Sequence, residues 1–71
     1  MTKRERIDGF VRDAVEAWYA SGRTYTCAAV VYDVIDPVAR SLCDGTSIRP
    51  RQVANLAYGQ IHARQEATRH G

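Results

Sequence analysis

The segment from Ser47 to Arg64, SIRPRQVANLAYGQIHAR, places the strongest constraint on how this chain can fold. Proline is tolerated in the first turn of a helix, where N–H groups lack intrahelical partners, so Pro50 indicates a helix start. Apolar residues then recur at helical spacing and predict one face for a core: Val53, Leu56, Ala57 and Ile61. We expect this helix to end near Thr68.

A second helical pattern covers Lys3 to Ser21. Its apolar residues form a stripe of helical period, namely Ile7, Phe10, Val11, Ala14, Ala17 and Trp18. Thr2 and Glu5 fit the S/T-x-x-E capping box, which satisfies two free N–H groups at a helix start. Gly22 suits the left-handed position that ends a helix. We expect Trp18 to anchor the core.

The stretch from Thr24 to Ile35 allows two interpretations. Its β-branched and aromatic residues suit a strand. Strict alternation nevertheless fails at residues 28–31, AAVV, and a lone strand would have no partner elsewhere in the chain. The apolar residues also fit helical spacing, so we expect a helix with Thr24 or Thr26 as its N-cap.

Asp36 and Pro37 mark a boundary, because proline disfavours helical geometry at the residue before it. We expect a short helix from Pro37 to Cys43, with a kinked continuation of the preceding helix as the alternative. Residues 44–46, DGT, then form a turn.

These patterns predict a single all-α domain spanning residues 1–71, a compact bundle of three to four helices. Residues 1–2 and 69–71 are expected to fray. A chain of 71 residues buries only about 60% of the surface its unfolded form exposes, so its core is small. The expected core residues are Phe10, Trp18, Val31, Ile35, Leu42, Leu56 and Ile61.

Composition excludes several classes of protein. No apolar run approaches the roughly 18 residues of a membrane span, and the N-terminus lacks the apolar region of a signal peptide, so we expect a cytoplasmic protein without a membrane partner. Cys27 and Cys43 lack metal-ligand spacing and are expected to be buried small residues. No nucleophile–base pair, carboxylate pair or phosphate loop is present. We therefore expect no metal, no cofactor and no enzymatic activity.

Positive charge is concentrated near the C-terminus. Residues 1–44 hold six basic and seven acidic side chains, for a net charge of −1, whereas residues 45–71 hold four and one, for +3. Such asymmetry is typical of a surface that binds nucleic acid or an acidic protein. The chain has nine arginines and one lysine, so part of the arginine content can reflect a GC-rich coding sequence.

The order of a short helix, a turn and a longer helix over residues 37–64 resembles the helix-turn-helix family of DNA-binding domains. Ala39 occupies the small-residue position of the first helix, and Val53 with Leu56 supply the paired apolar positions of the second. The turn is several residues longer than the compact form of the motif. The resemblance implies that the helix from Pro50 enters the major groove of double-stranded DNA.

The polar face of that helix supplies the candidate binding residues, which are Arg49, Arg51, Gln52, Asn55, Tyr58 and His62. Arginine can donate two hydrogen bonds to guanine, and Asn or Gln can pair with adenine. Tyr58 and His62 lie further along and can reach backbone phosphate. A small transcriptional or replication regulator is the function that this pattern favours.

A protein-interaction module is the alternative function. Arg, Tyr and Trp are enriched at interface hot spots, and a domain this small gains stability by forming a homodimer. The size and composition would also suit a phage or mobile-element accessory protein that binds a host protein.

Overall fold

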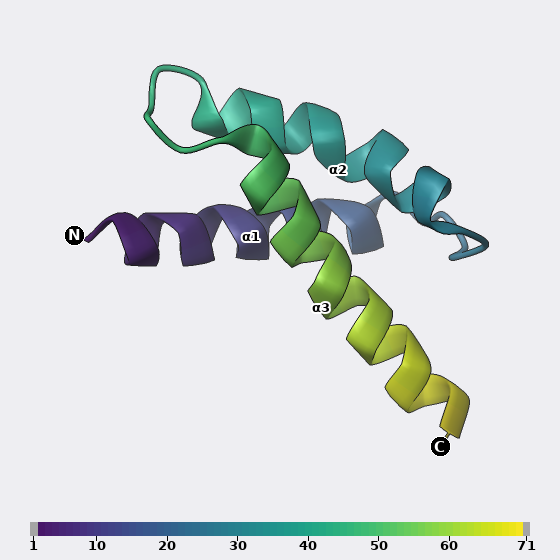
Figure 1. Ribbon diagram of the computed structural model, residues 1–71. Helices are drawn as coiled ribbons and strands as arrows, with labels where there is room; N and C mark the ends of the chain where they lie inside the picture. The colour runs from purple at the N-terminus through teal and green to yellow at the C-terminus, as the bar shows by residue number, and fades with distance from the viewer. Residues whose placement is uncertain (1, 71) are drawn as a thin grey trace.

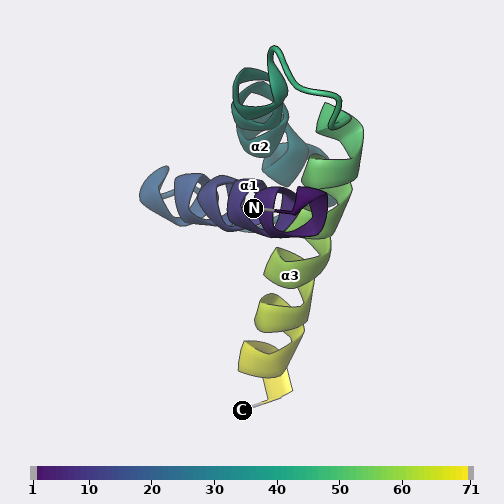
Figure 2. The same ribbon diagram turned by 90° about the vertical axis from the view of Figure 1, so that its left-hand side faces the viewer.

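The computed structural model describes residues 2–70, which form three α-helices and no β-strand. Helix α1 spans Lys3–Ala20, α2 spans Ala28–Cys43 and α3 spans Pro50–His70. Helices α1 and α2 run in opposite directions, and α3 crosses them with its C-terminal turns extending past both (Figures 1 and 2). The all-α prediction is confirmed. None of the described helices is long and apolar enough to cross a membrane.

Helix α1 begins and ends as the sequence predicts. The Thr2 hydroxyl accepts a 3.2 Å hydrogen bond from the backbone N–H of Glu5, so Thr2 caps the helix. Ser21 is the C-cap, and Gly22 follows in the left-handed region with φ 71°. Trp18 is buried and joins α1 to the core.

Helix α2 confirms the helical interpretation of the ambiguous stretch but corrects its start. The N-cap is Cys27, which makes no side-chain capping hydrogen bond, rather than Thr24 or Thr26. The β-branched residues of this segment are tolerated because tertiary burial outweighs propensity. Val31 and Ile35 both lie fully inside the core.

The predicted short helix from Pro37 to Cys43 is wrong, since Pro37 lies inside α2 and the alternative of a continued helix holds. Proline supplies no N–H for the carbonyl of Asp33, and in a helix interior it costs about 3 kcal/mol. Pro37 is exposed, so its ring meets solvent rather than the core. The buried residues Ile35, Ala39 and Cys43 lie on both sides of the proline and hold the two halves in one helix.

One core joins the three helices and the turn before α3. Its buried residues are Val11, Ala14, Trp18, Val31, Ile35, Ala39, Cys43, Ile48, Val53, Ala54, Ala57 and Ile61. Three expected core residues differ: Phe10 and Leu42 are only half-buried, and Leu56 is 46% exposed. Helix α3 packs on both other helices and turns Ala54 inward in place of Leu56. The small alanine side chain lets neighbouring helices approach closely.

The turn of residues 44–49 is held by its own hydrogen bonds. The Thr46 hydroxyl donates to the Cys43 carbonyl (2.7 Å) and accepts from the backbone N–H of Ile48 (3.1 Å). Gly45 adopts φ 77°, and Ile48 inserts into the core. The first residue of α3 is therefore fixed relative to the end of α2.

The predicted fraying concerns both ends of the chain. Thr2 caps α1, and α3 continues through His70. Met1 and Gly71 lie outside the described residues. Fraying of residues 1–2 and 69–71 stays a prediction.

Candidate nucleic-acid interface

The predicted binding residues fall on two sides of α3. Arg49, Arg51, Gln52 and Asn55 are all exposed. Arg51 and Asn55 face α2, whereas Gln52 lies beside the N-terminal part of α1 in a hollow that Leu56 also lines. The structure therefore brings these side chains near one another around the first two turns of α3, without placing them in one row.

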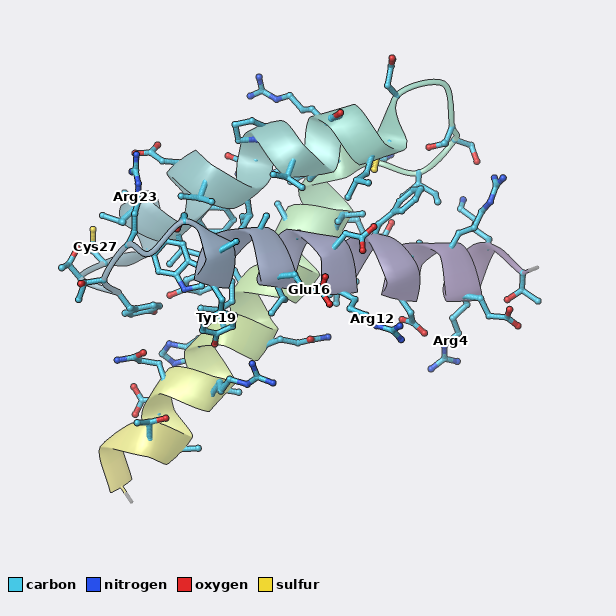
Figure 3. The ribbon with its side chains drawn as sticks, turned by 180° about the vertical axis from the view of Figure 1, so that it is seen from behind. Arg4, Arg12, Glu16, Tyr19, Arg23 and Cys27 are labelled. Atoms are coloured by element: carbon cyan, nitrogen blue, oxygen red, sulfur yellow. The ribbon has the colours of Figure 1, made fainter. Side chains whose placement is uncertain are left out.

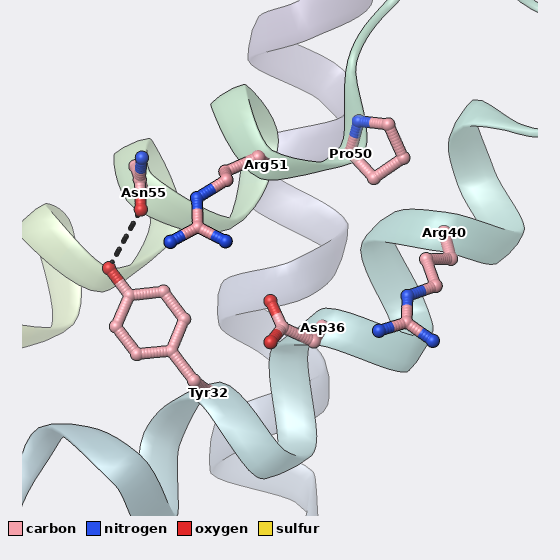
Figure 4. Close-up of a pocket in the computed structure, with 6 residues that line it drawn as sticks. All are labelled: Tyr32, Asp36, Arg40, Pro50, Arg51 and Asn55. Atoms are coloured by element: carbon pink, nitrogen blue, oxygen red, sulfur yellow. Dashed lines mark hydrogen bonds between the residues drawn. The ribbon is translucent and has the colours of Figure 1, made fainter.

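A cleft between α2 and the first turns of α3 contains part of this set, and we name it the α2–α3 cleft. Its volume is about 510 Å³, and it is lined by Tyr32, Asp36, Arg40, Pro50, Arg51 and Asn55 (Figure 4). Two arginines and one aspartate leave the lining with an excess of one positive charge. Figure 4 shows the Asp36 carboxylate lying between the two guanidinium groups.

Tyr32 forms one wall of the α2–α3 cleft and contacts α3 directly. Its hydroxyl donates a 2.9 Å hydrogen bond to the side-chain oxygen of Asn55 (Figure 4). Burial raises the pKa of the Tyr32 phenol, the electrostatic influence of the neighbouring Tyr58 and of the Asp36 carboxylate raises it further, and Arg51 opposes them. The neutral phenol is therefore the form that holds the Asn55 amide at neutral pH.

Beside the cleft lies a group of rings, the aromatic cluster, formed by Tyr25, Tyr32, Tyr58 and His62. The rings of Tyr32 and Tyr58 stack with centroids 5.0 Å apart, and those of Tyr58 and His62 stack at 5.9 Å. The hydroxyls of Tyr25 and Tyr58 are hydrogen bonded at 2.8 Å, and the Tyr25 hydroxyl also meets Nδ1 of His62 at 3.1 Å. The cluster ties the loop before α2 to the middle of α3.

This cluster changes the role expected for two of the predicted residues. Tyr58 is half-buried and its hydroxyl already has a partner in Tyr25. His62 is exposed, with one ring nitrogen engaged by Tyr25. The hydrogen bond to Tyr58 is the main cause that raises the pKa of Tyr25 to about 12. Both residues therefore hold the protein's own loop in place.

Sequence reasoning missed Arg40 and Tyr25. Arg40 seemed to belong to a separate short helix, but within the continuous α2 it follows Asp36 by four residues and lines the same cleft. Tyr25 precedes α2 in the chain and meets α3 only through the fold. The four-residue spacing of Asp36 and Arg40 was the sequence pattern that could have indicated Arg40. No local pattern indicated Tyr25.

The two cysteines lie in different surroundings. Cys43 is buried as expected, and burial raises the pKa of its thiol. Cys27 is exposed, which corrects the expectation that both are buried. The backbone N–H of Val30 in the first turn of α2 makes no capping hydrogen bond with the sulfur, but it favours the thiolate and is the main cause that lowers the pKa of Cys27. Both thiols are free, and among the side chains of residues 2–68 no group of three His, Cys, Asp or Glu is placed to hold a metal ion.

Comparison with known proteins adds no relative: no family model, no curated protein and no solved structure matches this chain. The residues and their geometry therefore carry the functional argument alone.

Proposed function

We propose that this protein binds double-stranded DNA, with the N-terminal turns of α3 as its recognition surface. The observation that carries the proposal is the exposure of Arg49, Arg51, Gln52 and Asn55 together at the start of a 21-residue helix. In helix-turn-helix proteins, exposed Arg, Gln and Asn side chains at the N-terminal end of a helix contact base edges in the major groove.

The hydrogen-bonding state of Asn55 supports base reading. Tyr32 occupies one lone pair of the Asn55 oxygen, and a second lone pair remains free to accept. The amide NH₂ group is free to donate. Asn55 thus retains one acceptor and one donor, which are the two groups that pairing with adenine N6 and N7 requires.

Arginines supply the affinity in this proposal. Residues 45–71 carry a net charge of +3, and Arg49 and Arg51 lie at the end of α3 that faces the turn. Positive side chains at a helix N-terminus oppose the helix dipole at a cost of a few tenths of a kcal/mol up to about 1. A phosphate backbone offsets that cost. A small regulator of transcription or replication is the class of protein that such a domain suits.

A salt titration of DNA binding tests the proposal. We expect affinity for duplex DNA to fall with salt at a slope of about −0.9 for each phosphate contacted. Gln52→Ala and Asn55→Ala should each remove about 1–3 kcal/mol of discrimination between binding sites. Gln60→Ala is the matched control, because Gln60 is an exposed amide further along α3. Affinity that does not respond to salt, or discrimination unchanged in both variants, would refute DNA binding.

Binding to a protein is the second candidate function, and the exposure of Leu56 favours it. This leucine is 46% exposed in the N-terminal third of α3 and lines a hollow with Ile7 and Gln52. A second copy of the chain or another protein could cover it. Leu56→Gln should then abolish association in a measurement of solution mass and leave DNA affinity unchanged; an unchanged mass profile would count against this candidate.

A further inference from the structure

We propose that the α2–α3 cleft binds a phosphate group through the guanidinium groups of Arg40 and Arg51, which lie on either side of the Asp36 carboxylate. The two arginines come from different helices and line the same cleft (Figure 4). Guanidinium groups match the geometry of phosphate oxygens and form charge-assisted hydrogen bonds with them.

The rest of the lining favours a phosphate ester over a free anion. The cleft measures about 510 Å³, within the roughly 300–1,000 Å³ of small-ligand sites, so a bare phosphate ion would leave much of it empty. The Tyr32 ring and Pro50 give the remaining wall an apolar character that suits a sugar. Pro50 is also the first residue of α3, so the positive end of the helix dipole adjoins the cleft.

Asp36 provides a direct test of the proposal, because its carboxylate repels phosphate. No ion pair within hydrogen-bonding range joins it to either arginine among the described residues, so the guanidinium groups keep donors available. The Asp36 charge limits affinity and leaves an excess of one positive charge in the cleft. Removing that charge without changing the side-chain shape, by Asp36→Asn, should therefore tighten phosphate binding.

Two sources can supply the phosphate ester: the backbone of duplex DNA or a free nucleotide. The cleft shares Arg51 and Asn55 with the recognition surface of the proposed function and adds Arg40 from α2. Binding of ADP tests the phosphate site without that function, so the two proposals can fail separately.

The experiment measures binding of a short DNA duplex and of ADP to the full chain, with Arg40→Ala, Arg51→Ala and Asp36→Asn. Arg12→Ala is the matched control, because Arg12 is an exposed arginine on α1 outside the cleft (Figure 3). We expect each cleft arginine variant to lose about tenfold in affinity for its phosphate source. With DNA, the salt slope should also become shallower by about 0.9 per lost contact. Circular dichroism verifies that each variant is folded.

The outcomes separate the possibilities. Losses confined to DNA place the backbone phosphate in the cleft, and losses with ADP place a nucleotide there. ADP binding without DNA binding would refute the proposed function and leave the phosphate site standing. DNA binding in which Arg40→Ala behaves like Arg12→Ala, with no ADP binding, would overturn the phosphate site. Binding of neither ligand, or weaker binding in Asp36→Asn, would overturn it as well.

Discussion

The hydroxyl of Tyr32 on α2 donates a 2.9 Å hydrogen bond to the side-chain oxygen of Asn55 on α3. This contact fixes the Asn55 amide before any partner arrives, because the oxygen faces α2 and the NH₂ group faces away (Figure 4). A side chain held in this way loses less conformational entropy when it binds. Tyr32 is therefore a positioning residue for the proposed recognition surface.

Tyr32→Phe should separate the effect of Tyr32 on the orientation of Asn55 from its effect on the stability of the fold. The ring and its stacking on Tyr58 remain, so the free energy of unfolding should fall by at most about 1 kcal/mol, the scale of one exposed hydrogen bond. Discrimination between DNA sites should fall, and affinity for non-specific DNA should be kept. Tyr19→Phe is the control, since no described hydrogen bond involves the Tyr19 hydroxyl. Equal discrimination in both variants would contradict the positioning role.

The orientation of α3 about its axis buries Ile61 and exposes Leu56, so substitutions at the two positions should lower the free energy of unfolding by very different amounts. Ile61 is 1% exposed, so Ile61→Ala should lower the free energy of unfolding by about 2–5 kcal/mol, enough to unfold a domain of this size. Leu56 is 46% exposed, and Leu56→Ala should cost about 1 kcal/mol or less. Urea denaturation followed by circular dichroism compares them, with Ile61→Val as the milder variant if Ile61→Ala does not fold. A cost for Leu56→Ala as large as that for Ile61→Ala would contradict the observed helix orientation.

Leu56 illustrates how far the sequence predicts this fold. The spacing of Val53, Ala57 and Ile61 predicts the buried face of α3 correctly, because those residues lie within one arc of the helix. The edges of that arc depend on where the neighbouring helices lie. Helix α3 contacts both α1 and α2, and that arrangement selects Ala54 over Leu56. Periodicity alone carries no information about the neighbours.

Replacing Pro37 should stabilise the protein. Pro37→Ala supplies an N–H for the free carbonyl of Asp33, and because Pro37 is exposed no core contact is lost. We expect the free energy of unfolding to rise by about 1–3 kcal/mol. Thermal and urea denaturation measure the change, with Ser41→Ala as the control for an exposed position in the same helix. Destabilisation would contradict the expectation that Pro37 weakens α2.

The hydrogen bond between Tyr25 and Tyr58 should make stability depend on alkaline pH. It is the main cause that raises the pKa of Tyr25 to about 12 from an ordinary value near 10. A group whose pKa is raised by folding stabilises the folded state fully below its unfolded pKa. That contribution is therefore present below about pH 10 and is lost as the pH rises through about 12.

Ultraviolet titration of tyrosinate, together with urea denaturation across this range, tests the prediction. Tyr58→Phe removes the main cause, so Tyr25 should ionise at lower pH and the alkaline loss of stability should shrink. Tyr19→Phe should lower the amplitude of the absorbance change by one tyrosine and leave the alkaline loss of stability in place. A Tyr25 titration that Tyr58→Phe does not move would contradict the assigned cause.

The candidate site was less predictable than the fold. Charge asymmetry and side-chain type indicated the start of α3, and the exposure of Arg51 and Asn55 agrees with that pattern. The hydrogen-bond partners of Asn55, Tyr58 and His62 come from α2 and from the loop before it, at sequence separations of 23, 33 and 37 residues. Such long-range contacts follow from how the helices cross. No periodic pattern in the sequence predicts them.

The exposed thiol of Cys27 at the start of α2 has a practical consequence for every measurement of mass and affinity. In an oxidising solution two copies of the chain can join through this sulfur, and the product would be a covalent dimer. Such a species would carry two copies of the proposed recognition surface, and avidity would then raise its apparent affinity in a DNA-binding measurement. Cys27→Ser, or a reductant in the buffer, keeps that artefact apart from a dimer that forms through Leu56.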